Sequence, residues 1–240
     1  MLNFFRKSRF LHSRMTFWRS NAKSFKDAQD LCVGSWSEQE SYPYSEYLLE
    51  RYCGEMGKAY DFGCGVGRMM KHMLYRFEHV DGGELVPENI AYAKEYLEGN
   101  VEADRKNFRL FQLDGKSAFV GEAGTYDFIY STIVIHHIAP FEVREQIYKD
   151  FLSMLKPGGA FCTQLVFGID TGMYWFDNPY EKISPRNTVD VSIPDESHLK
   201  KIEEWLNSLG FKDIAFRIKP CPHHGAVPEL KWLFIDGEKK

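Results

Sequence analysis

The chain has 240 residues, of which 44% are hydrophobic, so it is long enough to bury one sizeable core and short for two ordinary domains. It contains no stretch of about 18 uninterrupted apolar residues, which leaves no candidate for a membrane-spanning helix. Its five cysteines show no C-x-x-C spacing and accompany no secretory signal pattern. We therefore expect a reducing, cytoplasmic setting without a disulfide framework.

The net charge of −4 is unevenly distributed along the chain. Residues 1–26 hold seven basic side chains and no acidic one. This segment is typical of an amphipathic helix laid over the rest of the chain. The alternatives are an organellar transit peptide and an arm that binds nucleic acid or phosphate. Apolar spacing also indicates a helix near residues 47–52, and we expect residues 1–57 to form an N-terminal helical cap.

From residue 58 the sequence alternates between short apolar strands and amphipathic helices. The predicted strands are 59–62, 80–85, 108–113, 126–134 and 160–167, and the predicted helices between them are 68–77, 87–97 and 141–155. A last helix at 195–209 precedes a hairpin of strands 211–218 and 230–236. This order predicts a doubly wound α/β domain over 58–240, with a seven-stranded, mostly parallel sheet, an antiparallel C-terminal hairpin strand and helices on both faces. Residues 168–194 are too many for an ordinary connection and are predicted to be a lid insertion.

The strongest motif is Asp61-Phe-Gly-Cys-Gly-Val-Gly67, between a predicted strand and a predicted helix. Its glycines allow a tight turn and a close approach of the backbone to a ligand. The dinucleotide fingerprint G-x-G-x-x-G would need glycine at 68 or 70, where Arg68 and Met70 stand, and the G-K-[ST] ending of a P-loop is missing. The loop therefore indicates a nucleotide-type ligand other than NAD or a nucleoside triphosphate.

In this strand–turn–helix setting, Asp61-x-Gly63-x-Gly65-x-Gly67 resembles the first motif of the class I S-adenosylmethionine (SAM) dependent methyltransferases. The resemblance covers residues 58–167, where Lys156-Pro-Gly-Gly159 is similar to the turn before the family's fifth strand, and it returns over the last helix and hairpin. It implies SAM as cofactor and S-adenosylhomocysteine as product.

The same resemblance assigns cofactor-binding roles along the predicted strand ends. Glu84 ends the second strand and would accept the ribose hydroxyls, as the acidic residue of a Rossmann domain does. Leu85 would lie along the adenine, Asp114 with Gly115 would meet the adenine amino group, and Ser131 would face the methionine part. The complete predicted set is Asp61, Gly63, Cys64, Gly65, Gly67, Glu84, Leu85, Asp114, Gly115 and Ser131.

His136 and His137 follow the fourth predicted strand, at the edge of the sheet where ligands of such folds bind. A general base is needed only for an acceptor that is protonated at working pH, and imidazole titrates in the useful range. Both histidines are therefore predicted catalytic residues. The alternative is that one of them caps the next helix or shapes the pocket.

Aromatic side chains of the cap and of the insertion are predicted to line the acceptor site, and equally they can form a hydrophobic seam to the core. The predicted acceptor-binding residues are Tyr42, Tyr44, Tyr174, Trp175 and Tyr180. Asp177-Asn-Pro-Tyr180 imitates a [DN]-P-P-[YF] motif of amine methyltransferases, but that motif belongs after the fourth strand. No metal site is expected, because Pro222 separates Cys221 from His223 and His224 and no fourth ligand is evident.

Taken together, these features predict transfer of a methyl group from SAM to nitrogen or oxygen of a small-molecule acceptor. Two alternatives remain. The basic N-terminal arm can dock RNA or a protein substrate, in which case nucleic-acid binding would depend strongly on salt. The chain can also be a SAM-binding regulator without catalysis.

Overall fold

A computed structural model describes residues 15–20, 38–178, 191–220 and 231–240, with the backbone alone for residues 38–43. The described residues build one seven-stranded sheet in the order β3-β2-β1-β4-β5-β7-β6. The strands are β1 (Lys58–Phe62), β2 (His79–Glu84), β3 (Phe108–Gln112), β4 (Tyr126–Thr132), β5 (Leu155–Phe167), β6 (Phe211–Pro220) and β7 (Lys231–Lys239). β1 to β5 are parallel, and β7 runs antiparallel between β5 and β6. The predicted doubly wound sheet is confirmed.

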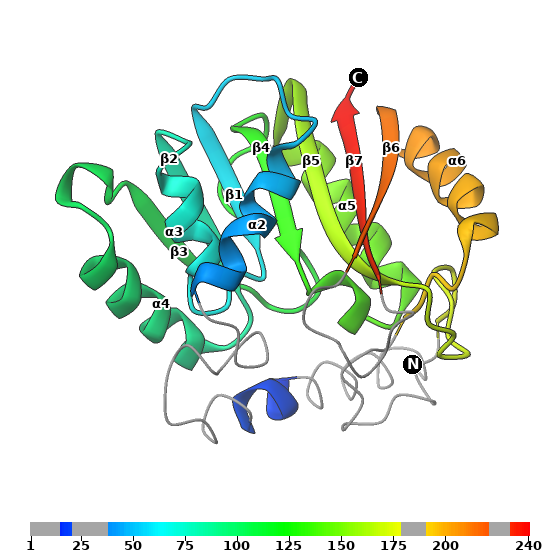
Figure 1. The fold of residues 1–240 in the computed structure, drawn as a ribbon, viewed down its shortest axis with the longest axis horizontal. Helices are drawn as coiled ribbons and strands as arrows, with labels where there is room; N and C mark the ends of the chain where they lie inside the picture. Colours follow the sequence, from blue (N-terminus) through cyan, green and yellow to red (C-terminus); the bar gives the residue numbers. More distant parts are fainter. Residues whose placement is uncertain (1–14, 21–37, 179–190, 221–230) are drawn as a thin grey trace.

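Helices cover both faces of this sheet (Figure 1). They are α2 (Glu38–Leu49), α3 (Arg68–Leu74), α4 (Pro87–Asn100), α5 (Phe141–Met154) and α6 (Leu199–Leu209), with short 3-10 turns η1 (Ala103–Arg105), η2 (Ile135–His137) and η3 (Glu196–His198). Residues 15–20 are also helical.

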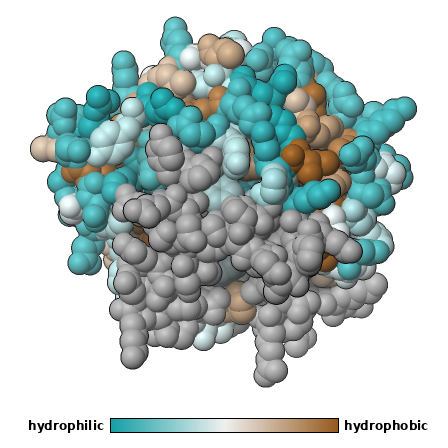
Figure 2. All heavy atoms as spheres, viewed as in Figure 1, coloured by the Kyte–Doolittle hydropathy of each residue, from teal (hydrophilic) through white to brown (hydrophobic). Residues whose placement is uncertain are grey.

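The side chains of successive strand residues point to opposite faces of the sheet and so divide the core into two layers. Phe128 and Tyr130 of β4 pack with α2, α3 and α4, whereas Ile129 between them packs with α5 and α6. The surface seen in Figure 2 is mainly hydrophilic over the described residues, with a few brown areas between. Most apolar residues of the predicted strands and helices are thus buried in these two layers.

Several element boundaries differ from the predicted ones. The fourth strand ends at Thr132 instead of residue 134, because Ile133 adopts a left-handed φ of 57°. The predicted turn at Lys156-Pro-Gly-Gly159 is included in β5, where the pairing register with β4 shifts. The helix expected at 195–209 is split into η3 and α6, and the Asp195 side chain accepts a hydrogen bond from the Ser197 amide at its start. Among the helices of the described ranges, none combines the length and apolarity that a bilayer crossing needs.

Candidate functional site

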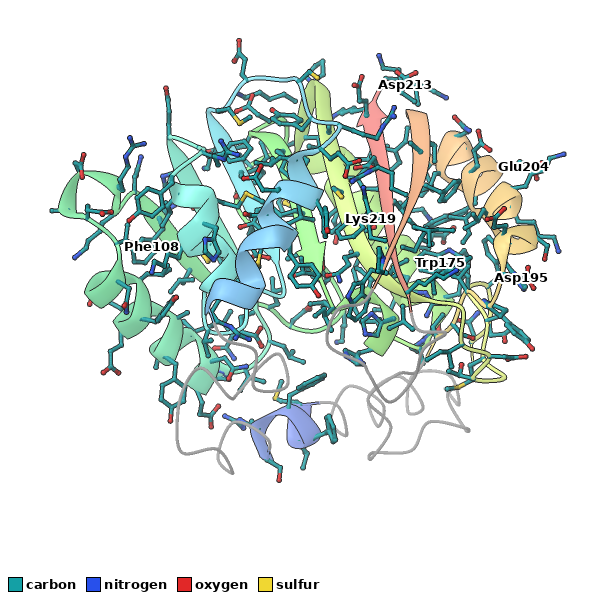
Figure 3. All side chains as sticks on the ribbon, in the orientation of Figure 1. Phe108, Trp175, Asp195, Glu204, Asp213 and Lys219 are labelled. Carbon is teal, nitrogen blue, oxygen red and sulfur yellow. The ribbon has the colours of Figure 1, made fainter. Side chains whose placement is uncertain are left out.

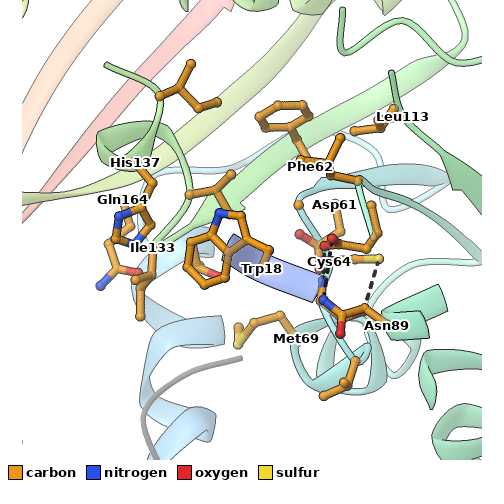
Figure 4. Close-up of a pocket in the computed structure, with 18 of the residues that line it drawn as sticks. Trp18, Asp61, Phe62, Cys64, Met69, Asn89, Leu113, Ile133, His137 and Gln164 are labelled. Atoms are coloured by element: carbon orange, nitrogen blue, oxygen red, sulfur yellow. Dashed lines mark hydrogen bonds between the residues drawn. The ribbon is translucent and has the colours of Figure 1, made fainter. Parts of the chain in front are cut away.

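A cavity opens at the carboxyl ends of the central strands, where the loops of a parallel sheet gather ligands (Figure 4). Its walls come from the loop after β1, the ends of β2, β4 and β5, and the turns after β3 and β4. Trp18 of the helical segment 15–20 and Tyr44 of α2 complete it. The N-terminal part of the chain therefore contributes directly to the site.

The loop after β1 is held in a shape that only glycine adopts freely. Gly63, Gly65 and Gly67 have φ values of 76°, 54° and 82°. The amides of Gly63 and Cys64 donate to the Gly83 carbonyl oxygen at 2.8 and 3.1 Å, which fixes the loop against β2. A Cβ atom at position 63 would lie 2.4 Å from a Val134 methyl carbon. The glycine here thus permits the chain after β4 to approach the loop closely.

Replacement of Gly63 by alanine is expected to destabilise the protein by at least about 1–2 kcal/mol, the usual penalty of a left-handed residue with a Cβ. The contact with Val134 adds to this penalty. Urea unfolding measures the effect. Gly99→Ala is the control, since a Cβ there meets nothing within 4 Å and alanine favours the α4 helix by up to about 1 kcal/mol. Equal stability of the two variants would contradict the assigned loop geometry.

Glu84, the last residue of β2, connects this loop to the next helix. Its carboxylate accepts hydrogen bonds from the Gly65 amide at 3.0 Å and the Val86 amide at 2.9 Å, and a longer one from the Asn89 side chain at 3.5 Å. The side chain is buried at the cavity wall, and this burial raises its pKa while the hydrogen bonds oppose the shift. The carboxylate is therefore rigidly placed before any ligand binds.

Asp61, at the end of β1, is 1% exposed and also lines the cavity. Neither of its carboxyl oxygens has a hydrogen-bond partner within the described ranges. Burial raises the pKa of Asp61 well above its ordinary range, and Tyr130, its register partner on β4, opposes this shift. A buried carboxyl group that is not satisfied by the fold can be satisfied by a cationic donor on a ligand.

The structure brings seven of the ten predicted cofactor-binding residues to the cavity wall: Asp61, Gly63, Cys64, Gly65, Glu84, Leu85 and Gly115. The other three are not part of that wall. Gly67 is the N-cap of α3, and the Ser131 hydroxyl donates to the Phe62 carbonyl oxygen at 2.8 Å, so that it ties β4 to β1. Asp114 is exposed, and its Oδ1 accepts from the amides of Lys116 and Ser117 at 2.8 and 3.1 Å. It shapes the turn after β3.

The two predicted catalytic histidines lie in η2 and differ in position. His137 lines the cavity, with its ring 5.2 Å from that of Trp18. His136 is turned away from the cavity wall into the interior, where burial lowers its pKa to about 3. Its carbonyl oxygen accepts from the Val191 amide at 2.9 Å. The strained Ile133 redirects the chain just before this turn, and such strain is frequent at functional sites.

Two predicted acceptor-binding residues prove to lie elsewhere. Trp175 is 1% exposed and packs in the core against Tyr148 and Trp205, on the α6 side of the sheet (Figure 3). Tyr174 lies at the surface, stacked on His198. This part of the insertion therefore packs against α5 and α6, and none of its described residues lines the cavity. Aromatic composition alone could not distinguish these two destinations.

Trp175 nevertheless supports the turn that carries the histidines. The buried Arg144 of α5 donates to the carbonyl oxygens of Ile138, Ala139 and Trp175, and its guanidinium lies 5.0 Å from the Trp175 ring centre. The segment Asp177-Asn178 also has a structural role, because the Asn178 side chain accepts from the Glu142 amide at 3.0 Å, at the start of α5. Pro179 and Tyr180 of the same motif lie outside the described residues.

Tyr44 lies at the cavity, and its hydroxyl accepts from the Trp232 indole at 3.1 Å. The Tyr42 side chain, Tyr180, and the group of Cys221, His223 and His224 lie outside the described residues. Sequence reasoning missed Trp18, Asn89 and Gln164, which also line the cavity. Gln164 carried a usable signal, because it is a lone amide inside the apolar run Phe161–Phe167.

Comparisons with known proteins identify a related family of domains. Residues 60–161 match the family model of a methyltransferase domain. A methyltransferase of Claviceps purpurea (strain 20.1) is 29% identical over 113 residues, which cover 47% of this chain and 32% of the relative. A ubiquinone biosynthesis O-methyltransferase of Marinobacter nauticus is 29% identical over 114 residues, covering 47% of this chain and 45% of the relative. The chain thus spans less than half the length of these relatives.

Solved structures show a similar fold. Phosphoethanolamine N-methyltransferase 2 of Haemonchus contortus, in complex with phosphomonomethylethanolamine and S-adenosylhomocysteine, superposes with a TM-score of 0.63 at 17% identity. The match covers 88% of this chain and 56% of that one. At this identity the similarity establishes the architecture.

Proposed function

We propose that this chain, which carries a class I SAM-dependent methyltransferase domain, transfers a methyl group from SAM to a nitrogen or oxygen atom of a small-molecule acceptor. The observation that carries the proposal is the pair of buried carboxyl groups at one cavity wall: Asp61 has no hydrogen-bond partner among the described residues, and Glu84 is fixed by backbone amides.

The residues of this wall fit SAM. Asp61 would pair with the ammonium group of the methionine part and Glu84 would accept the ribose hydroxyls. Leu85 and Leu113 offer apolar contact to the adenine. SAM supplies a methyl group that is already activated by its sulfonium. The protein's own task is then to align the acceptor and to exclude water.

The other half of the cavity supports a small acceptor. Trp18 and Tyr44 close it from the N-terminal side, and His137 closes it from the turn after β4. Two of the similar proteins also have names that refer to small molecules, a ubiquinone biosynthesis O-methyltransferase and a phosphoethanolamine N-methyltransferase. The alternative of an RNA- or protein-docking arm depends on residues 1–26, of which the structure describes only 15–20.

The test is a thermal-shift titration of the purified chain with SAM, S-adenosylhomocysteine and NAD, followed by assays of methyl transfer to small amines and phenols. We expect stabilisation by the first two ligands, because a ligand that binds only the folded state raises the melting temperature. A shift with NAD alone would refute the proposal. Binding of SAM without methyl transfer to any acceptor would favour the alternative of a SAM-binding regulator without catalysis.

Asp61 makes cofactor binding pH-dependent. Its raised pKa keeps the carboxyl group protonated to higher pH in the free protein, whereas a bound ammonium group favours the carboxylate. Binding of S-adenosylhomocysteine below that raised pKa should therefore release a proton. The affinity is expected to increase as pH rises toward the raised pKa and then to level off.

Isothermal titration in buffers of different ionisation enthalpy measures this proton release. Asp61→Asn should abolish the release and weaken binding by about tenfold or more, the loss of one charge-assisted hydrogen bond. Asp104→Asn, the same change at an exposed position in η1, should alter neither. Proton release that persists in Asp61→Asn would assign it to another group.

A further inference from the structure

Gln164 of β5 carries a buried side-chain amide at the cavity wall. The residue is 0% exposed, and neither its side-chain oxygen nor its nitrogen has a hydrogen-bond partner within the ranges that the structure covers. Cys162 and Val166, its neighbours on the same face of β5, pack into the apolar layer under α2. Gln164 instead lines the cavity. An unpaired buried amide costs stability, so its presence at a cavity wall points to a ligand.

The position of Gln164 separates it from the cofactor side of the cavity. It pairs in register with Thr132 at the end of β4, just before the turn that carries His137. In the view of Figure 4, Gln164 and His137 lie on one side of Trp18, and Asp61 and Asn89 lie on the other. The amide thus belongs to the half of the cavity that remains for the acceptor.

The charged side chains of the cavity wall come from a limited set of elements. Among the described lining residues, the Asp, Glu, Lys, Arg and His side chains are Asp61, Arg68, Glu84 and His137. The first three come from the loop after β1, the start of α3 and the end of β2. The described lining residues from the ends of β4 and β5 and from the turn after β4 include no Lys, Arg, Asp or Glu to pair with a phosphate, carboxylate or ammonium group. Burying such a charge there would be strongly unfavourable.

We propose that Gln164 recognises the methyl acceptor, and that this acceptor is a neutral, mainly apolar molecule that presents a hydrogen-bond donor and an acceptor side by side. This inference rests on the proposed methyl transfer. A side-chain amide offers one oxygen and one NH₂ group, which match such a pair of groups. The apolar side chains of Ile133, Val134 and Ile138 enclose the remainder of the molecule.

Salicylamide and salicylate test this class, because they share a ring and a hydroxyl and differ in an amide against a carboxylate. Each is titrated calorimetrically into the full chain saturated with S-adenosylhomocysteine. We expect salicylamide to bind at least ten times more tightly than salicylate. Gln164→Leu should lower the affinity for salicylamide at least tenfold and leave the affinity for S-adenosylhomocysteine unchanged. Gln112→Leu, the same change at an exposed position of β3, should leave both affinities unchanged.

The outcomes separate the two proposals. Absence of S-adenosylhomocysteine binding by the unmodified chain would refute the proposed function. If S-adenosylhomocysteine binds normally, three results would each overturn the inference about the acceptor. Salicylate could bind as tightly as salicylamide, salicylamide could fail to bind, or Gln164→Leu could leave the affinity for salicylamide unchanged.

A second measurement excludes a purely structural role. Leucine is close to glutamine in size and leaves no unpaired polar atom, so Gln164→Leu is expected to raise the melting temperature of the ligand-free chain by a few degrees. Gln112→Leu should change it little. A lower melting temperature of Gln164→Leu would show that the amide serves the fold and would overturn its role in recognition.

Discussion

Replacement of Glu84 by alanine is expected to weaken binding of S-adenosylhomocysteine by about 100-fold or more. A carboxylate that accepts both ribose hydroxyls makes two charge-assisted hydrogen bonds, each of about 1.5–3 kcal/mol. The variant also frees the Gly65 and Val86 amides, which hold the glycine loop to the start of α4. Isothermal titration of the purified variant measures the loss.

The control for this experiment is Glu95→Ala, which removes an exposed carboxylate from α4 and should bind normally. Glu84→Gln keeps the shape and one acceptor oxygen, so its affinity should fall between those of the alanine variant and the unmodified chain. If Glu84→Ala is folded and binds S-adenosylhomocysteine as tightly as the unmodified chain, the cofactor does not use this wall of the cavity.

Replacement of His137 by alanine is expected to lower kcat by about 10²–10⁴, the usual contribution of a general base, with little change in cofactor affinity. His137 is the histidine of η2 that faces the cavity. The effect is measured as the rate of S-adenosylhomocysteine formation at saturating SAM and acceptor. It applies to an acceptor that must lose a proton, such as a phenol.

His136→Ala is the matched comparison, because the two residues are adjacent and the chemical change is the same. The His136 imidazole, with its pKa lowered to about 3, is a weak base and faces the interior. Its removal should reduce stability by leaving a cavity in the core and should reduce kcat less than His137→Ala does. A larger loss of kcat in His136→Ala than in His137→Ala would reverse the assignment.

The sequence predicted those parts of the site that depend on strand ends and glycines. Glu84 was assigned through the resemblance to the class I methyltransferases, in which an acidic residue ends the second strand. The structure shows this contact as the hydrogen bond to Gly65. The same resemblance also assigned Asp114 to the site, but its carboxylate is exposed and shapes the turn after β3.

The acceptor half was less predictable, because it depends on packing between distant segments. Trp175 and Tyr44 looked alike as aromatics of a cap or lid, yet one packs beneath α6 and the other lines the cavity. Ile133 was predicted to continue the fourth strand, because an apolar β-branched residue gives no indication of a positive φ. Trp18 lay in a segment whose strongest pattern was its charge.

The place of β7 between β5 and β6 also sets the order in which this protein can be completed on the ribosome. β6 is synthesised before β7 but has no strand to pair with until β7 emerges, and meanwhile one long edge of β5 stays open. Such an edge invites pairing with other nascent chains. Tyr44 and Tyr47 of α2 pack on Trp232 and Phe234, so the wall beside Gln164 closes only with that last strand. The ability to bind a ligand in the cavity should therefore arise late, after β7 has been synthesised.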